Sequence, residues 1–272
     1  GMIDVVLKKK TGKTSFVGEV SFGPRGTGQS IPDVDGQSFH IQNLYATYAA
    51  SEKLSLTAGY MGTFIGYEVI SPLGNLNYST SYLFTNGPFQ NAGIKANYAL
   101  SSKVGLMVGL YSDQWNTYQS MPEFGLNAFG AQLSVTPAEG FTAYFNLLTG
   151  SESGTIVDLT AAYQITPKFK LGLNAADFSG VESGSGYSGV ALYPSVAISN
   201  SFGLGLRAES FKSKTEDTSV SAFTLSANFK SGGLTFIPEI RLDNASEDSF
   251  STSTGNPTKS ASQFALAMVY GF

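Results

Sequence analysis

The sequence predicts an all-β fold, a transmembrane antiparallel up-and-down β-barrel that occupies residues 1–272 as a single domain. Three observations lead to this prediction: a composition poor in charge, segments whose side chains alternate in character, and connections that alternate in length. We expect about sixteen strands in the intact barrel and about fifteen within residues 1–272.

The composition is unlike that of an ordinary globular domain. Charged residues make up 13% of the chain, against roughly a quarter in typical soluble proteins. Aromatic residues also make up 13%, with 20 Phe and 14 Tyr beside 1 Trp. No segment approaches the roughly 18 to 20 consecutive apolar residues of a membrane-spanning helix. The composition therefore favours strands with one face toward lipid and the other toward water.

Several segments repeat with a period of two. Residues 104–110, 141–147 and 223–229 alternate apolar side chains with small or polar ones, and residues 264–272 do so most regularly. A helix would repeat its apolar residues every three or four positions, which these segments do not. We therefore expect each of them to be a strand.

The connections between these segments fall into two classes of length. The short turns are expected near 11–12, 51–52, 101–102, 137–140, 167, 200–201 and 231–232. The longer polar loops are expected at about 24–36, 67–88, 116–123, 150–153, 179–186, 213–218 and 245–259. Short turns on one side and long loops on the other are typical of outer-membrane barrels, whose short turns are periplasmic.

The alternation also predicts the direction of each strand. If the last strand ends at Phe272 on the periplasmic side, counting back makes the first segment, near residues 3–10, run toward the periplasm as well. Bacterial single-chain barrels have an even number of strands, so we expect one further strand before Ile3 that this sequence lacks. The alternative is that one segment has been split or merged, most readily around residues 38–50.

Two regions resemble known proteins. The last nine residues, FALAMVYGF, resemble the outer-membrane signal that the barrel-assembly machinery recognises, and the signal residues are Phe264, Leu266, Met268, Tyr270 and Phe272. From about residue 17 to 98, the stretches FVGEVSFGPRG, IQNLYATY, LTAGYMGTFIGYE and NYSTSYLFTNGPFQNAGIK resemble the OmpL-like porin family of Gram-negative outer-membrane β-barrels. The resemblance implies a barrel with a pore in the outer membrane, in contact with lipid and lipopolysaccharide, and it indicates no particular solute.

In a barrel of about sixteen strands, side chains do not fill the interior, so a water channel is expected. Residues whose parity opposes the aromatic set are the pore-lining candidates. They are Glu19, Lys95, Asp113, Asp158, Lys170, Asn174, Arg207, Glu209, Glu239, Arg241 and Asp243. Charges of both signs would give weak selectivity among small polar solutes. Alternatively, these charges pair with one another and brace the wall.

The connection at about 67–88 is the candidate for a constriction, because long connections without secondary structure of their own are usually functional or disordered. Its hydrogen-bonding candidates are Tyr67, Glu68, Asn75, Asn77, Tyr78 and Ser81, followed by Tyr82. Either the loop folds inward and narrows the lumen, or it extends outward and packs on neighbouring loops. Aromatic residues near strand ends are expected in the two interfacial girdles. They are Tyr60, Phe64, Tyr98, Phe141, Tyr163, Phe169, Phe202, Phe229, Tyr270 and Phe272.

Enzymatic readings are disfavoured. A hydroxyl nucleophile normally needs a positioned base, and the chain has a single histidine, His40. With no cysteine, zinc chemistry is disfavoured and no cofactor is expected. Residues 33–36, DVDG, resemble the start of a calcium loop but lack its later Glu. The formal net charge of −4 and the lack of a basic stripe argue against nucleic acid. A diffusion porin is the first hypothesis. An accessory barrel with an occluded lumen in a larger complex is the alternative, and a homo-oligomer is left open.

Overall fold

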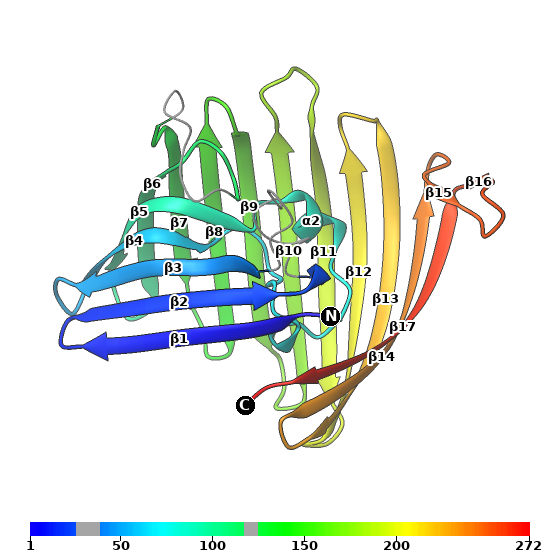
Figure 1. Cartoon of the computed structure of the whole chain (residues 1–272), viewed down its shortest axis with the longest axis horizontal. Coiled ribbons are helices and arrows are strands. Elements are labelled where there is room, and N and C mark those ends of the chain that lie inside the picture. Colours follow the sequence, from blue (N-terminus) through cyan, green and yellow to red (C-terminus); the bar gives the residue numbers. More distant parts are fainter. Residues whose placement is uncertain (26–38, 117–124) are drawn as a thin grey trace. The chain divides into compact units, whose positions relative to one another are not determined.

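The computed structural model describes residues 1–25, 39–116 and 125–272. Its strands form one 15-stranded antiparallel sheet, in which every strand pairs with its neighbours along the chain, and a separate 2-stranded hairpin, β15–β16 (Figure 1). The prediction of about fifteen up-and-down strands is confirmed. The strand order is linear, with β1 and β17 as its two end strands. The expected loops at 24–36 and 116–123, and the DVDG stretch at 33–36, lie wholly or mostly outside the described residues.

The strands of the large sheet are β1 (Ile3–Thr11), β2 (Thr14–Phe22), β3 (Phe39–Ala49), β4 (Leu54–Gly62), β5 (Gln90–Ala99), β6 (Val104–Tyr111), β7 (Ala128–Val135), β8 (Phe141–Gly150), β9 (Gly154–Gln164), β10 (Phe169–Ser179), β11 (Gly186–Ala197), β12 (Phe202–Ser213), β13 (Thr218–Ser231), β14 (Leu234–Ala245) and β17 (Ser260–Tyr270). The small hairpin is β15 (Phe250–Ser251) and β16 (Pro257–Thr258), and two short helices are η1 (Pro72–Gly74) and α2 (Tyr82–Asn86). None of the helices in the described ranges combines the length and hydropathy needed to cross a membrane.

Contacts divide the chain into two compact units. Unit 1 holds residues 1–65, 87–137 and 144–157, and unit 2 holds residues 66–86, 138–143 and 158–272. Each unit builds its own part of the sheet. All contacts discussed below lie within one unit or the other.

The two faces of the sheet differ as the period of two predicts. In β13, Phe223 and Leu225 are 54% and 49% exposed, whereas Ala222, Thr224 and Ser226 are completely buried. We call these the exposed face and the covered face. In β17 the residues Phe264, Leu266, Met268 and Tyr270 are likewise on the exposed face. Because alternate residues of a strand point to opposite sides, one sequence pattern produces both faces.

Short hairpin turns depend on glycine at two positions. Gly12 follows β1 with a φ of 58°, and Gly232 follows β13 with a φ of 57°. In both hairpins the flanking residues pair directly across a two-residue turn, a geometry that needs positive φ and therefore favours glycine. The connection at 150–153, predicted among the longer loops, is also short, because β8 ends at Gly150 and β9 begins at Gly154.

The predicted aromatic girdle is wrong for two residues. Tyr60 is 4% exposed, and the ring of Phe64 packs against the buried Tyr111 with their centroids 5.7 Å apart. Phe64 lies beyond the end of β4, where strand parity no longer applies. Next to Tyr60, Gly59 has a φ of 132°, which interrupts the regular alternation. The girdle candidates on the exposed face are Tyr98, Tyr163, Phe229, Tyr270 and Phe272, and Phe141, Phe169 and Phe202 are half-buried.

Candidate constriction segment and adjoining cavity

Residues 66–86 of unit 2, which form the central part of the connection between β4 and β5, contain all the predicted constriction candidates. We call them the constriction segment. They include η1 and α2, and α2 lies beside β11 and β12 (Figure 1). Their polar groups bind side chains from the covered face of β12, β13 and β14, as the following contacts describe.

Arg207 of β12 is the centre of these contacts. Its side chain is completely buried, and its Nη1 lies 2.8 Å from Oε1 of Glu68 in an ion pair. The guanidinium also donates to the backbone oxygens of Ser79 (2.6 Å) and Thr80 (3.1 Å). A further bond of 3.1 Å runs to Oγ1 of Thr224. The guanidinium offers five donors in a rigid plane, so it suits a place where several oxygens converge.

The other carboxylate oxygen of Glu68 binds the segment itself. Oε2 accepts hydrogen bonds from the backbone N–H (2.7 Å) and the hydroxyl (2.6 Å) of Ser81. Burial, and after it the negative charge of Glu68, raises the pKa of the neighbouring Tyr67 above its usual range, so this phenol stays neutral. Glu68 therefore links the two ends of the segment to Arg207.

Glu239 of β14 holds the middle of the segment. Its carboxylate accepts the backbone N–H groups of Tyr78 (2.6 Å) and Ser79 (2.9 Å), and the hydroxyl of Ser226 at 2.7 Å. Glu239 is 1% exposed. A buried carboxylate is tolerated when its oxygens are satisfied in this way.

Glu209 of β12 holds the start of α2. Its carboxylate accepts the backbone N–H groups of Tyr82 (3.0 Å) and Leu83 (2.9 Å). The first N–H groups of a helix have no partner within the helix, and a carboxylate at that end satisfies them. The position of α2 is thus fixed by a wall residue.

Arg241 and Asp243 of β14 form a second charged contact. Nε of Arg241 lies 2.9 Å from both carboxylate oxygens of Asp243, and its Nη1 donates to the backbone oxygen of Thr80 at 2.8 Å. The guanidinium carbon also lies 4.9 Å from the ring centroid of Tyr82. This arrangement combines an ion pair with a cation–π contact against the segment.

Two predicted carboxamides have different roles. Asn77 is 2% exposed, and its Nδ2 donates to the hydroxyl of Ser226 at 2.7 Å, so it binds the wall. Asn75 instead closes a local loop, because it accepts from the N–H of Val69 (3.0 Å) and donates to the oxygen of Val69 (2.6 Å).

Glycines in the strands make room for the segment. A β-carbon at Gly172 of β10 would overlap the ring of Tyr67, which itself stacks on Tyr193 with centroids 4.5 Å apart. A β-carbon at Gly205 of β12 would lie 3.0 Å from that of Leu76. Glycine inside a strand often marks a place where another part of the chain approaches closely.

The segment begins at another predicted pair. Asn174 of β10 donates to Oδ2 of Asp158 of β9, and Oδ1 of Asp158 accepts the N–H of Gly66 at 3.2 Å. Lys170 of β10 lies apart from this pair and lines the cavity described below. Five of the pore-lining candidates in unit 2 therefore contact the constriction segment, namely Asp158, Arg207, Glu209, Glu239 and Arg241.

The remaining candidates lie in unit 1. Glu19 of β2 accepts the side-chain N–H of Asn43 at 2.6 Å, and Lys95 of β5 is half-buried opposite Thr57. Asp113 lies just after the end of β6.

Asp113 accepts four hydrogen bonds from the turn between β8 and β9. The donors are the backbone N–H of Glu152 (3.0 Å), the hydroxyl of Ser151 (2.8 Å), and the N–H (3.0 Å) and hydroxyl (2.6 Å) of Ser153. Burial alone raises the pKa of Asp113, but these donors together outweigh it and lower the pKa below the usual value.

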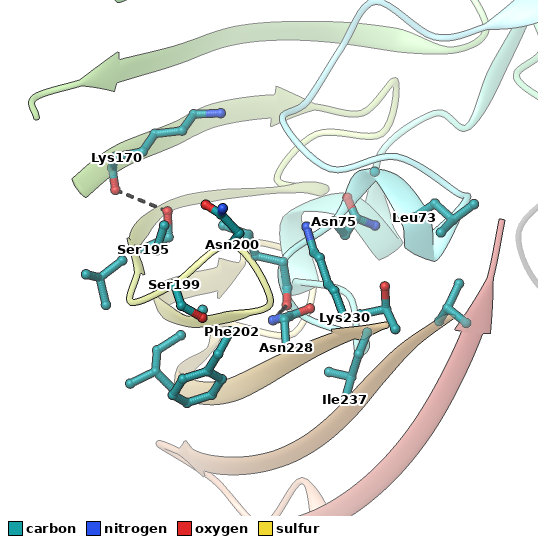
Figure 2. Close-up of a pocket in the computed structure, with 18 of the residues that line it drawn as sticks. Leu73, Asn75, Lys170, Ser195, Ser199, Asn200, Phe202, Asn228, Lys230 and Ile237 are labelled. Atoms are coloured by element: carbon teal, nitrogen blue, oxygen red, sulfur yellow. Dashed lines mark hydrogen bonds between the residues drawn. The ribbon is translucent and has the colours of Figure 1, made fainter. Parts of the chain in front are cut away.

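A cavity of about 670 Å³ adjoins the constriction segment within unit 2. Figure 2 shows Lys230 extending toward Asn75, with Lys170 and Asn200 around the same space. Asn228 lines it as well and donates to the backbone oxygen of Leu76 at 3.0 Å. The wall of the cavity also includes residues at the short turns after β9, β11 and β13.

The sequence reasoning missed several of these residues. It did not single out Ser79 and Thr80, whose backbone groups bind the wall, or Thr224, Ser226 and Asn228, which lie on the covered face of β13. It also missed the cavity residues Lys168 and Lys230. The parity of β13 was the available signal for its three polar residues, whereas lysines beside turns are too ordinary to attract attention.

The family comparison decides the identity of the fold. A family model described as "Putative beta-barrel porin-2, OmpL-like" matches residues 1–272. The chain belongs to this OmpL-like porin family. It is therefore an outer-membrane porin of a Gram-negative bacterium, as the sequence resemblance indicated. No curated protein matches the chain.

Solved porin structures share the fold of this OmpL-like porin. The trimer form of OmpT from Vibrio cholerae is 9% identical with a TM-score of 0.62, and the match covers 99% of this chain and 90% of that one. The anion-selective porin from Comamonas acidovorans is 13% identical with a TM-score of 0.61, and the match covers 95% of this chain and 89% of that one. A variant of the Rh. blastica porin is 15% identical with a TM-score of 0.57, and the match covers 98% of this chain and 89% of that one.

Proposed function

We propose that this OmpL-like porin allows passive diffusion of small polar solutes, and that the constriction segment sets their size limit. The observation that carries the proposal is the way the segment is held. Arg207 binds it through an ion pair with Glu68, and Glu209, Glu239 and Arg241 bind it through hydrogen bonds to its backbone. A segment fixed to a wall at so many points narrows a channel reproducibly.

The chemistry of the segment fits polar solutes. Its carboxylate, Glu68, is neutralised by Arg207, and Tyr67 and Tyr82 are uncharged phenols. The polar groups left toward water are hydroxyls, amides and backbone groups, which exchange hydrogen bonds with water at little cost.

The test compares the conductance of two shortened variants in planar bilayers. Replacing residues 69–85 by a short Gly/Ser linker is expected to increase the single-channel conductance and to let larger sugars enter proteoliposomes in swelling assays. The matched control shortens residues 252–256 at the tip of the β15–β16 hairpin, whose hydrogen bonds within the described ranges stay inside that hairpin. An unchanged conductance in the first variant would refute the constriction.

The same recordings separate the porin from an accessory barrel. Ohmic steps from the wild-type protein support diffusion through the lumen. If correctly folded, heat-modifiable protein gives no steps, the chain acts instead as a closed barrel within a larger complex.

We further propose that the protein is a channel and not an enzyme. The single histidine of the chain, His40, lies in β3 and is 4% exposed, which is a poor position for a general base. Among residues 1–25, 39–116 and 125–272, no group of three or more His, Asp or Glu side chains is arranged to hold a metal ion.

The whole chain is proposed to form one barrel domain, whose partners are lipid, lipopolysaccharide and, during assembly, the barrel-assembly machinery. A homotrimer is proposed because the Vibrio cholerae OmpT structure is described as a trimer form. Chemical cross-linking of protein extracted in mild detergent tests this: a species no larger than a monomer would refute it.

A further inference from the structure

The lysines of unit 2 fall into two groups. Lys212, Lys214 and Lys259 form ion pairs with Asp217 (2.9 Å), Asp177 (2.7 Å) and Glu247 (3.8 Å), respectively. The other group is Lys168, Lys170 and Lys230, all of which line the 670 Å³ cavity. We call this cavity the lysine vestibule.

The vestibule lysines have no counter-charge among the described residues. Their ammonium groups make no ion pair or hydrogen bond there, in contrast to every other lysine of unit 2. The vestibule wall includes no Asp or Glu from the described ranges. Its other polar residues are neutral, among them Asn200 and Asn228. The charged side chains that line this space are therefore all positive.

The carboxylates of the covered face in this unit are already committed. Glu68 pairs with Arg207, and Asp243 pairs with Arg241. Glu209 and Glu239 accept backbone N–H groups of the constriction segment and are 4% and 1% exposed. Asp158 is 2% exposed and accepts hydrogen bonds from Asn174 and from the backbone N–H of Gly66. None of these five carboxylates lines the vestibule, so none offers an accessible oxygen to a passing cation there.

We propose that the lysine vestibule makes the porin selective for small anionic solutes. The proposal rests on the proposed diffusion function. Charges of one sign in a hollow lined by protein raise the local concentration of the opposite ion. One unit charge about 7 Å from an ion in water changes the local concentration of that ion by roughly threefold. Three lysines around one space add their effects.

The test measures reversal potentials across a planar bilayer with a potassium chloride gradient. The wild-type protein is expected to be more permeable to chloride than to potassium. Because the Debye length falls from about 10 Å at 0.1 M to about 3 Å at 1 M salt, the preference should weaken as the salt concentration rises.

The variant Lys168→Gln/Lys170→Gln/Lys230→Gln is expected to lower the chloride-to-potassium permeability ratio by roughly threefold or more. The matched control, Lys212→Gln/Lys214→Gln/Lys259→Gln, removes the same formal charge from ion-paired positions and should change the ratio much less. Single-channel conductance and heat-modifiable migration establish that each variant is folded.

The outcomes distinguish a failure of the proposed anion selectivity from a failure of the proposed diffusion function. A wild-type preference for potassium, or equal shifts in the two triple variants, would overturn anion selectivity while leaving diffusion intact. Absence of any conductance from folded wild-type protein would overturn both.

Discussion

Replacing Arg207 by methionine should release the constriction segment from the wall. The guanidinium is completely buried and binds Glu68 together with the backbone oxygens of Ser79 and Thr80. Methionine fills a similar volume but leaves the carboxylate of Glu68 without its counter-ion and two carbonyl groups without a donor. The segment is then expected to leave the covered face and take Glu68 to water.

The magnitude follows from the burial of the pair, whose side chains are 0% and 3% exposed. Removing one partner of a buried ion pair costs about 3–5 kcal/mol, because the remaining charge stays desolvated. At about 1.4 kcal/mol per tenfold change, segment opening becomes roughly two to three and a half orders of magnitude more frequent. The double variant Glu68→Gln/Arg207→Met should cost less than the sum of the two single variants, because no charge is then left buried.

Hydrogen exchange in detergent micelles measures this opening directly. The N–H groups of Ser81 and Leu83 donate to Glu68 and Glu209 and should lose protection in Arg207→Met. The control is Lys212→Met in the same strand, whose ion pair with Asp217 is 51% and 85% exposed and therefore contributes little to stability. If both N–H groups keep their wild-type protection in the folded Arg207→Met variant, Arg207 does not hold the segment and the reasoning fails.

Two further predictions concern unit 1 and β17. The pKa of Asp113 is lowered in the folded state, so its stabilisation of the 151–153 turn is complete above the usual Asp pKa and is lost as the pH falls through the lowered value. Hydrogen exchange at the backbone N–H of Ser153 should therefore rise in that acidic window. The variant Asp113→Asn should abolish this pH dependence. Replacing Phe272 by Asp should reduce the yield of protein in the outer membrane, whereas Phe272→Tyr should not; equal yields, measured by immunoblotting of membrane fractions, would argue against an assembly signal that includes Phe264, Leu266, Met268 and Tyr270.

The architecture could be predicted from the sequence because strand parity is local information. Alternation within β13 and β17 assigns each residue to a face without knowledge of any other strand. The prediction fails where that local rule ends. Phe64 lies past the end of β4, and Tyr60 follows Gly59, whose positive φ disturbs the alternation. Both aromatic rings were therefore assigned to the lipid interface, although Tyr60 is buried and the half-buried Phe64 packs against Tyr111.

The contacts of the candidate site could not be predicted in the same way. Arg207 and Glu239 were identified as residues that oppose the aromatic face, and Glu68 as a residue of a long connection. The contact between Glu68 and Arg207 is long-range, because the two residues are 139 positions apart in the sequence. Parity tells which side of the sheet a charge occupies but not what covers that side. Whether such a charge meets water or the constriction segment depends on the tertiary fold.

The same distribution of partners links the constriction to the proposed selectivity. The constriction segment presents backbone N–H groups to the strands, and carboxylates such as Glu209 and Glu239 accept their hydrogen bonds. Acidic residues committed in this way are withdrawn from solvent, whereas lysine cannot accept a hydrogen bond from an N–H group. Lys170 and Lys230 therefore stay available to solutes in the lysine vestibule. Holding the segment with carboxylates leaves positive charge beside it, so one structural requirement favours both the narrowing and the preference for anions.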